Sequence, residues 1–284
     1  MSPLPGGGDT REILARRGLH LRRELGQNFL TDDRLADRLA GLAGVGPEDR
    51  VIEVGTGLGV LTRALARRAR TVISFEIDSG LVAALGEEGL LPANVELIHA
   101  DALGVDLGEF VGDGEAPVRV VANLPYSAAT PLLRRMLDLR HRLADWSVML
   151  QREVAKRIVA PVGSRDYGSL AVLHHLTVDA QVQQELGPGS FFPAPAVHSS
   201  FLRVWPRQTP LLEPGELAHV ERVVRAAFAQ RRKTLVNCLR AGSTWAGGDR
   251  ARLEGLLEGV GIDPGKRAEQ VDPQRLLALA RALA

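Results

Sequence analysis

Four consecutive residues near the middle of the chain combine a side-chain amide, a rigid turn and an aromatic ring: Asn123, Leu124, Pro125 and Tyr126. The amide oxygen of Asn123 and the backbone carbonyl of Leu124 could accept both hydrogens of an adenine amine and aim its lone pair at the methyl group of a sulfonium. Proline would hold these acceptors in place, and Tyr126 offers a ring on which a flipped base can stack. Such chemistry needs alignment rather than a strong base. The alternative interpretation is a proline turn with a half-buried tyrosine.

Glycines cluster earlier in the chain, in the run EVGTGLG (53–59). Gly55 and Gly57 would let the backbone turn tightly and approach a ligand closely. In a dinucleotide-binding fingerprint the third glycine falls three residues after the second, whereas Gly59 falls only two residues after Gly57. This spacing argues against a nicotinamide cofactor. For the loop taken alone, a plain structural turn stays open as the alternative.

Acidic residues stand at the ends of the next two predicted strands. Glu76, in FEID (75–78), lies about 20 residues beyond the glycine loop, where a carboxylate accepts ribose hydroxyls in other doubly wound folds. Asp101 and Ala102 end the third strand and could meet the adenine edge of the same ligand. Any one acid alone is more often a helix cap or a surface group. Ligands of such sheets nevertheless bind at the carboxyl ends of strands, where these acids fall.

A parallel sheet is required to bring these residues together, and the sequence predicts one. Short β-branched runs alternate with helical patterns such as 60–68 and 130–139, the latter with a proline in its first turn. We expect strands at 50–54, 71–76, 95–100, 118–122 and 146–150, and two more at 169–177 and 199–205 toward the far edge. The alternation predicts an α/β fold with a doubly wound, Rossmann-like sheet covered by helices.

The pattern changes after Pro206. The run QTPLLEPGE is typical of a linker, and helical patterns follow at 214–230, 231–241, 249–260 and 272–283. We therefore predict a ligand-binding catalytic domain over residues 1–207 and a smaller all-α domain over residues 208–284.

Charge is distributed unevenly, although the formal net charge is only +1. Residues 219–240 contain six Lys or Arg against the single acid Glu221, and residues 11–23 contain five Arg against Glu12. Two basic segments on a nearly neutral chain indicate an anionic partner that binds one side, such as a nucleic acid. A solvated helix face is the alternative explanation for either segment.

Composition excludes several classes of protein. Hydrophobic residues make up 45% of the chain, enough for a core, and no stretch predicts a signal peptide or a membrane-spanning helix. The single cysteine, Cys238, excludes an internal disulfide framework, and the seven histidines form no metal-ligand spacing. We expect a cytoplasmic protein without a metal, and nothing in the sequence requires more than a monomer.

A series of motifs in this order and spacing resembles the KsgA/RsmA family of small-subunit rRNA adenine dimethyltransferases. The resemblance runs from about residue 11 to residue 280. It is carried by LGQNFL (25–30), EVGTGLGVLT (53–62), FEID (75–78), HADAL (99–103), NLPY (123–126), MLQREVAKRI (149–158), FFPAPAVHSSFLRV (191–204) and AFAQRRKTLVNCL (227–239). The resemblance implies a class I methyltransferase fold, with S-adenosylmethionine as the cofactor.

The resemblance also implies roles for individual residues. The cofactor contacts would come from Gln27, Asn28, Leu30, Gly55, Gly57, Glu76, Asp101, Ala102 and Asn123. The residues from Asn123 to Tyr126 would position the target adenine, with Phe191 stacking on its other side. Arg231, Arg232 and Lys233 would belong to the RNA-binding face.

The family modifies two adjacent adenines in a hairpin loop near the 3′ end of small-subunit rRNA, within an assembling subunit. The chain departs from the usual pattern at Thr56, Ser127, Ala196 and His198, which puts local RNA contacts near 196–198 in doubt. Two alternatives stay open. One is a large-subunit rRNA adenine methyltransferase of the macrolide-resistance type, and the other is a non-catalytic ribosome assembly factor.

Overall fold

The computed structural model describes residues 14, 22, 25–87, 89–112, 118–126, 128–213, 215–241 and 245–284, without the side chains of 246 and 247. Most of the basic segment at 11–23, and Ser127, therefore lie outside the described residues. The chain divides into two compact units: residues 1–152 with 181–205, and residues 153–180 with 206–284.

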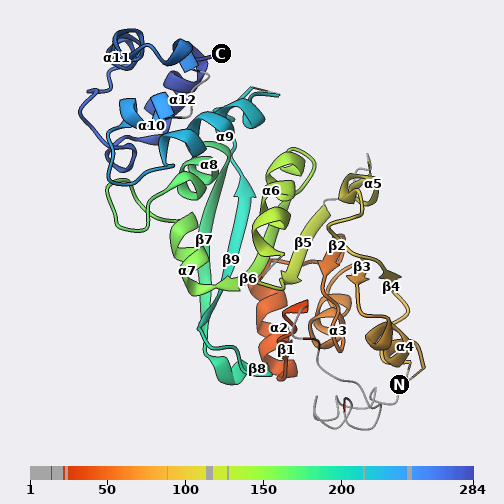
Figure 1. Cartoon of the computed structure of the whole chain (residues 1–284). Helices are drawn as coiled ribbons and strands as arrows, with labels where there is room; N and C mark the ends of the chain where they lie inside the picture. Colours follow the sequence, from red (N-terminus) through yellow and green to blue (C-terminus); the bar gives the residue numbers. More distant parts are fainter. Residues whose placement is uncertain are drawn as a thin grey trace. The chain divides into compact units, whose positions relative to one another are not determined.

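A seven-stranded sheet runs through the first unit (Figure 1). Its strand order is β4-β3-β2-β5-β6-β9-β7, and the five strands from β4 to β6 are parallel. The strands are β2 (Arg50–Val54), β3 (Thr71–Glu76), β4 (Val95–His99), β5 (Val118–Asn123), β6 (Asp145–Gln151), β7 (Val178–Leu186) and β9 (Ser199–Pro206). A separate antiparallel pair joins β1 (Phe29–Leu30) to β8 (Phe191–Phe192). The predicted α/β, doubly wound class is confirmed.

Helices connect the parallel strands. They are α2 (Asp33–Leu42), α3 (Val60–Ala66), α4 (Ser79–Glu87), α5 (Leu107–Val111) and α6 (Ala129–Leu139). Helices α2 and α3 pack on the sheet, where Leu39 and Leu65 join Val51 and Val72 in one buried cluster. In the central register Val54 lies opposite both Phe75 and Ala122. The carboxyl ends of β2, β3 and β5 therefore meet at one edge of the sheet.

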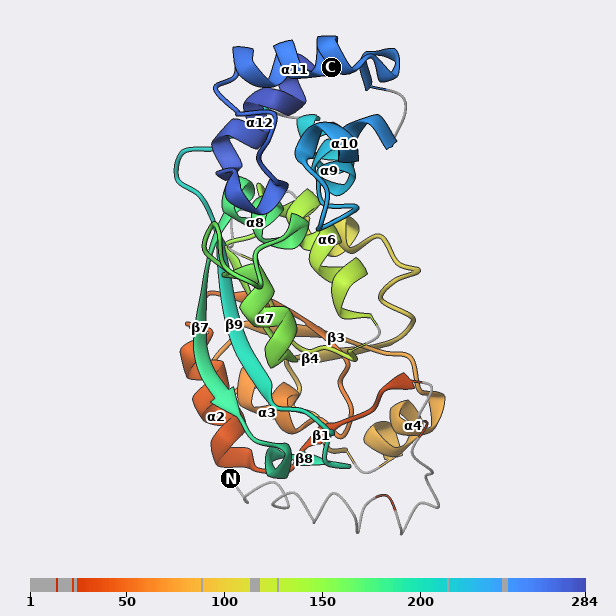
Figure 2. The same cartoon turned by 60° about the vertical axis from the view of Figure 1, so that its left-hand side comes forward.

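The far edge of the sheet is antiparallel. Strand β9 pairs with β6 in antiparallel register, and β7 is outermost; Figures 1 and 2 show β7 and β9 running side by side. The predicted strand at 199–205 is confirmed, whereas the predicted strand at 169–177 is wrong, because this run forms helix α8 (Ser169–Thr177). Six of its nine residues are buried, so its apolar pattern shows no single face that distinguishes a helix from a strand.

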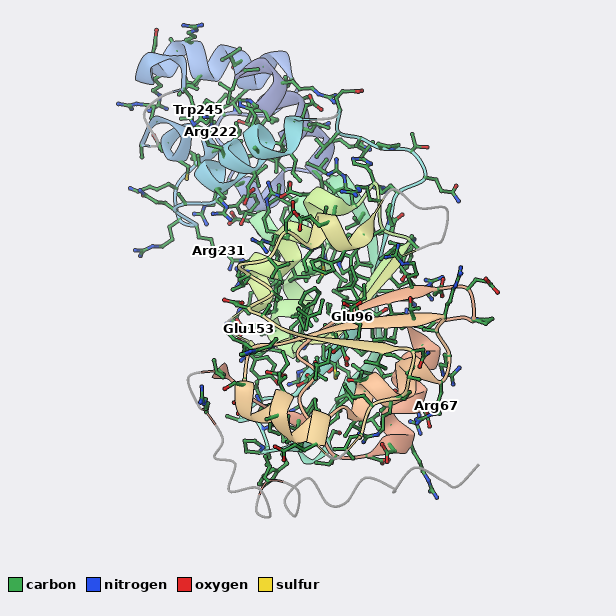
Figure 3. All side chains as sticks on the ribbon, turned by 90° about the vertical axis from the view of Figure 1, so that its right-hand side faces the viewer. Arg67, Glu96, Glu153, Arg222, Arg231 and Trp245 are labelled. Carbon is green, nitrogen blue, oxygen red and sulfur yellow. The ribbon has the colours of Figure 1, made fainter. Side chains whose placement is uncertain are left out.

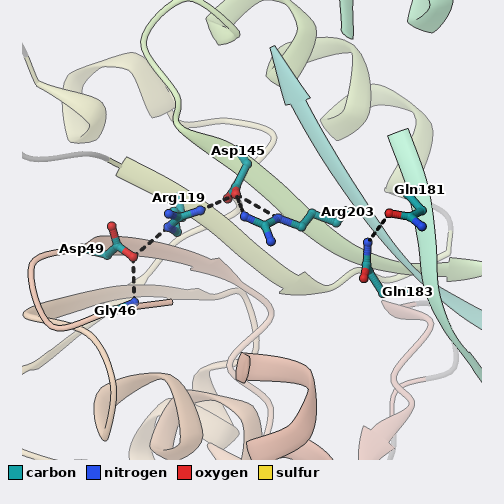
Figure 4. A network of polar contacts seen from close by, with 7 residues as sticks. All are labelled: Gly46, Asp49, Arg119, Asp145, Gln181, Gln183 and Arg203. Atoms are coloured by element: carbon teal, nitrogen blue, oxygen red, sulfur yellow. Dashed lines mark hydrogen bonds and ion pairs between the residues drawn. The ribbon is translucent and has the colours of Figure 1, made fainter. Parts of the chain in front are cut away.

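Charged side chains join neighbouring strands at the amino ends of the parallel strands, away from their carboxyl ends (Figure 4). Arg119, near the start of β5, donates from Nε to Asp49 Oδ2 at 2.7 Å and forms an ion pair with Asp145 at the start of β6. Arg203 of β9 also reaches Asp145, with 2.6 Å between Nη2 and Oδ2. The Asp145 side chain is only 3% exposed, so both arginines compensate its buried charge.

The second unit is mainly helical within its described residues, and it also includes residues 178–180 at the start of β7. It contains α8, α9 (Glu216–Ala227), α10 (Leu235–Ala241), α11 (Arg250–Gly259) and α12 (Pro273–Ala282), most of α7 (Arg152–Ile158), and short 3₁₀ turns at Trp245–Gly248 and Ala268–Gln270. A third such turn, Pro188–Ser190, lies in the first unit. In the second unit the guanidinium of Arg222 lies 5.0 Å from the centre of the Trp245 ring, and Figure 3 shows the two side chains together.

The division between the units differs in one respect from the predicted domains. The break at 205/206 is next to the predicted boundary at 207/208. Residues 153–180, which we assigned to the first domain, instead pack with the C-terminal helices. Tyr167 donates its hydroxyl to the carbonyl of Val271 at 3.1 Å, and α8 contacts α9 and α12. The apolar residues of α8 are thus buried by segments about 50 to 100 positions further along the chain, a pairing that no local pattern contains.

Candidate cofactor and substrate pocket

A pocket of about 200 Å³ opens at the carboxyl ends of strands β2 to β5. It is lined by residues 25–29, 100–103 and 123–126, and by Val54, Gly55, Gly57, Phe75, Glu76, Ile77, Ala128 and Leu132. All of these residues belong to the first unit. The pocket therefore collects the glycine loop, the two acidic strand ends and the NLPY loop that the sequence singled out separately.

The glycine loop depends on backbone conformations that other residues rarely adopt. Gly55 and Gly57 have φ angles of +84° and +59°. A Cβ atom on Gly57 would lie 2.8 Å from Cδ1 of Phe29, so the space beside this glycine is already filled. The backbone can therefore border the pocket directly at these two positions.

Glu76, the last residue of β3, holds the glycine loop in place. Its Oε2 accepts a hydrogen bond of 2.8 Å from the Gly57 N–H, and its Oε1 accepts one of 2.9 Å from the Asp78 N–H. Glu76 is 5% exposed, and this burial raises its pKa, while the two backbone donors act in the opposite direction. Each oxygen keeps a lone pair with which a ribose hydroxyl could bond.

Asp101 begins the loop that follows β4. Its Oδ1 accepts from the Leu103 N–H at 2.8 Å, and its carbonyl oxygen accepts from the Gly104 N–H at 2.8 Å. These two bonds form a tight turn that presents Asp101 and Ala102 to the pocket. Oδ2 is then the carboxylate oxygen that can accept from a ligand amine.

The segment before β1 forms another wall of the pocket. Gln27 donates from Nε2 to Asp78 Oδ2 at 2.9 Å, which ties this segment to the end of β3. Asn28 contributes its carbonyl oxygen, which accepts a hydrogen bond of 2.7 Å from Nδ2 of Asn123. Asp78, for which the sequence alone indicated no role, therefore positions Gln27.

The amide of Asn123 is oriented by that bond. A carbonyl oxygen can only accept, so the Asn123 nitrogen must face Asn28, and Oδ1 is left as the acceptor for a ligand. Tyr126 is also anchored, because its hydroxyl lies 2.7 Å from Ser199 Oγ at the start of β9. Ser199 was missed at the level of sequence; its signal was the serine pair in the FFPAPAVHSSFLRV motif.

Two predicted contact residues do not line the pocket. Leu30 and Phe191 are each 4% exposed and lie opposite one another in the β1–β8 pair, where both join the core cluster. A cofactor contact by Leu30 and base stacking by Phe191 stay predictions. Arg231, Arg232 and Lys233 form an exposed turn between α9 and α10 in the second unit, so the predicted helix over 231–241 begins only at Leu235.

A fully buried carboxyl group, Glu53, lies at the end of β2, two residues before Gly55. Its Oε2 accepts hydrogen bonds of 2.6 Å from Thr62 and from Ser74, and Ser74 is also 2.6 Å from Thr56 of the glycine loop. Burial raises the pKa of Glu53 to about 8, although the two hydroxyl donors act to lower it. Glu53 belongs to the EVGTGLG run, but nothing in the sequence indicated a role for it.

Neither a metal cluster nor a membrane-spanning helix occurs in the described part of the chain. No group of three or more His, Cys, Asp or Glu residues could hold a metal ion there. No helix among those residues is long and apolar enough to cross a bilayer.

Residues 18–283 match the model of the family described as ribosomal RNA adenine dimethylase. The chain belongs to this family. The protein named ribosomal RNA small subunit methyltransferase A of Geobacillus thermodenitrificans is 39% identical over 279 residues, covering 97% of this chain and 95% of the relative. The protein of the same name from Rhodospirillum rubrum is 42% identical over 283 residues, covering 98% and 94%.

Solved structures show the same fold. A dimethyladenosine transferase from Plasmodium falciparum superimposes with a TM-score of 0.74 at 23% identity, covering 88% of this chain and 95% of that chain. The 23S rRNA methyltransferase ErmE superimposes with a TM-score of 0.63 at 28% identity, covering 90% and 99%. The shared fold thus extends over most of this chain.

Proposed function

We propose that this chain transfers methyl groups from S-adenosylmethionine to the exocyclic amines of two adjacent adenines, in a 3′-terminal hairpin loop of small-subunit rRNA. The observation that carries the proposal is the Asn123 amide, fixed by Asn28 with its oxygen left as an acceptor beside the glycine loop. The names of the relatives at 39% and 42% identity support the small subunit as the source of the substrate.

The residues present fit S-adenosylmethionine. The Glu76 carboxylate, locked against Gly57, suits two ribose hydroxyls, and Asp101 with Ala102 suits an adenine edge. Gln27 and Asn28 stand at the wall where the methionine end would bind. When bound, this cofactor supplies an electrophilic methyl group on a positively charged sulfur.

The chain's own contribution to the reaction is alignment. Asn123 Oδ1 and the Leu124 carbonyl accept the two amine hydrogens, so the nitrogen lone pair is directed at the methyl group. Tyr126, held by Ser199, provides the stacking surface for the base. The amine becomes acidic once it carries the new methyl group, so a strong general base is not needed. The proposed catalysis rests on preorganised acceptors.

The test is methyl transfer from radiolabelled S-adenosylmethionine to undermethylated small and large ribosomal subunits, followed by nucleoside analysis. We expect dimethyladenosine in the small subunit only. Label in the large subunit would favour the alternative that the ErmE structure represents, at 28% identity. Binding to the small subunit without label would favour a non-catalytic assembly factor.

We further propose that Arg231, Arg232 and Lys233 bind rRNA, as part of an RNA-binding role for residues 208–284. All three side chains are exposed. Replacing them with Gln should weaken RNA binding and reduce the slope of log affinity against log salt by about 2 to 3, because up to three phosphate contacts are lost. The matched control replaces three exposed arginines of the first unit, Arg34, Arg38 and Arg70. Equal slopes in the two triple variants would contradict the assignment.

The proposed substrate is rRNA within an assembling subunit, which implies action in the cytoplasm. We propose that the chain acts as a monomer, because no step of the proposed chemistry calls for a second copy.

A further inference from the structure

A single arginine on α6 holds the loop that follows β4. The Nη1 atom of Arg135 donates hydrogen bonds of 2.8 Å to the carbonyl oxygens of both Ala102 and Val105. Arg135 is half-buried, and within the described residues its guanidinium meets these carbonyls rather than a carboxylate. A charged donor shared by two carbonyls makes a stronger link than neutral bonds between backbone groups.

The loop it holds forms one side of the pocket. Ala102 and Leu103 line the pocket together with Asp101. The turn itself is short, with Leu103 and Gly104 donating back to Asp101, and it ends where Asp106 caps α5 through the Gly108 N–H at 2.8 Å. Arg135 closes this turn from outside, because its two acceptors stand on either side of Leu103 and Gly104.

We propose that Arg135 is a positioning residue for the adenosine end of the cofactor. It fixes the loop of residues 101–105 so that the Asp101 carboxylate and the Ala102 backbone face the adenine. The inference rests on the proposed use of S-adenosylmethionine.

The chain offers a matched control in Arg142. Its Nη2 atom also donates to two carbonyls, those of Gly108 and Gly112, each at 3.1 Å. These carbonyls belong to the α5 segment and do not line the pocket. Arg142→Met therefore removes the same kind of link a few residues further along, without touching the pocket wall.

The experiment compares Arg135→Met, Arg135→Lys and Arg142→Met with the wild-type chain. Calorimetry measures binding of S-adenosylhomocysteine and of 5′-methylthioadenosine, which lacks the amino acid end. For Arg135→Met we expect both dissociation constants to rise by about tenfold, equivalent to about 1.4 kcal/mol, with kcat changed less than about twofold. Arg135→Lys, which keeps a charged donor, should recover most of the affinity. Arg142→Met should bind both ligands like the wild type.

A second measurement needs no ligand. Hydrogen exchange in the free protein should show faster exchange of the Leu103 and Gly104 amides in Arg135→Met, with the glycine-loop amides unchanged. Unchanged affinity and exchange in Arg135→Met would overturn the inference, and so would equal losses in Arg135→Met and Arg142→Met, which would indicate general loosening. A wild-type chain that binds neither ligand would contradict the proposed function itself, and the inference with it.

Discussion

The Nδ2 atom of Asn123 donates a hydrogen bond of 2.7 Å to the carbonyl oxygen of Asn28, 95 residues earlier in the chain. This bond joins the NLPY loop to the segment that precedes β1. It also decides which end of the Asn123 amide a ligand meets. The same hydrogen bond therefore fixes both the pocket wall at Asn28 and the orientation of the proposed catalytic acceptor, Asn123 Oδ1.

The first prediction concerns Asn123. Replacing it with Ala removes a preorganised acceptor, so kcat for methyl transfer should fall by about a hundredfold or more, while cofactor affinity falls much less. Single-turnover transfer and calorimetry separate the two effects. Asn94→Ala is the control, because Asn94 also donates from Nδ2 to backbone carbonyls, those of Ala66 and Ala69, but lies outside the pocket. Equal effects of the two substitutions on kcat would contradict the proposed role.

A second prediction concerns Glu76. In Glu76→Gln one carboxylate oxygen becomes an amide nitrogen that faces a backbone N–H, at Gly57 or at Asp78. Loss of charged acceptors should weaken cofactor binding by about tenfold or more, because each such bond contributes about 1.5–3 kcal/mol. Calorimetry with S-adenosylhomocysteine is the measurement. Glu96→Gln is the control. Glu96 is an exposed residue of β4 (labelled in Figure 3), so its substitution should leave the affinity unchanged.

Gly57 gives a third prediction. Gly57→Ala forces a Cβ atom to 2.8 Å from the Phe29 ring, in a backbone conformation with φ of +59°. Gly89→Ala has nearly the same φ, +57°, with nothing within 4 Å of the added atom. Both should lose about 1 kcal/mol of stability from the left-handed backbone, measured by urea unfolding. Only Gly57→Ala should also lose cofactor affinity. If the two variants bound the cofactor equally well, the Phe29 ring would have moved aside without disturbing the glycine loop.

The fourth prediction is a pH dependence that originates at Glu53. Burial raises its pKa in the folded chain to about 8, from an ordinary value of 4.5. Between these values the folded chain holds a proton that the unfolded chain has lost, so the free energy of unfolding falls as pH rises through this window. Above about pH 8 this contribution levels off.

Glu53→Gln removes that proton equilibrium and tests the prediction. Urea unfolding between pH 5 and pH 9 should show the variant gaining stability relative to the wild type as pH rises, until the difference becomes constant above about pH 8. Glu76 and Arg63, the charged residues that affect Glu53, are unchanged in both chains. Parallel stability profiles for the two chains would show that Glu53 is already ionised at neutral pH.

A fifth prediction concerns the ion-pair network around Asp145, at the amino ends of the parallel strands. Asp145→Asn removes the buried charge that Arg119 and Arg203 share, while Arg119 keeps its pair with Asp49, so the free energy of unfolding should fall by about 1.5–3 kcal/mol. Asp37→Asn is the control, because the pair between Asp37 and Arg67 (labelled in Figure 3) is exposed and should contribute at most about 1 kcal/mol. Chemical denaturation measures both, and similar small losses would show that the network is dispensable.

The sequence by itself determined where the parallel strands lie along the chain and where the candidate site residues stand on them. Each of the five parallel strands was found within a residue or two of its bounds, because alternation of short β-branched runs and helical patterns is a local signal. The glycine loop, Glu76, Asp101 and the NLPY loop each stand at or just beyond the carboxyl end of a strand. Since parallel strands end at one edge, their convergence on a single pocket followed from the sequence.

Only the tertiary structure decided how these residues are held. The contacts of Asn28 with Asn123, Arg135 with Ala102 and Tyr126 with Ser199 join positions from 33 to 95 residues apart, and no local pattern encodes such pairs. The same reason explains the error at 169–177. Helices of the second unit bury most of α8, so its sequence lacks the polar face by which a surface helix is recognised. It also explains why the raised pKa of Glu53 could not be predicted. That pKa depends on complete burial of the carboxyl group, which no local pattern in the sequence indicates. Local periodicity can be recognised in the sequence, whereas the burial and orientation of a side chain depend on which distant segments pack together.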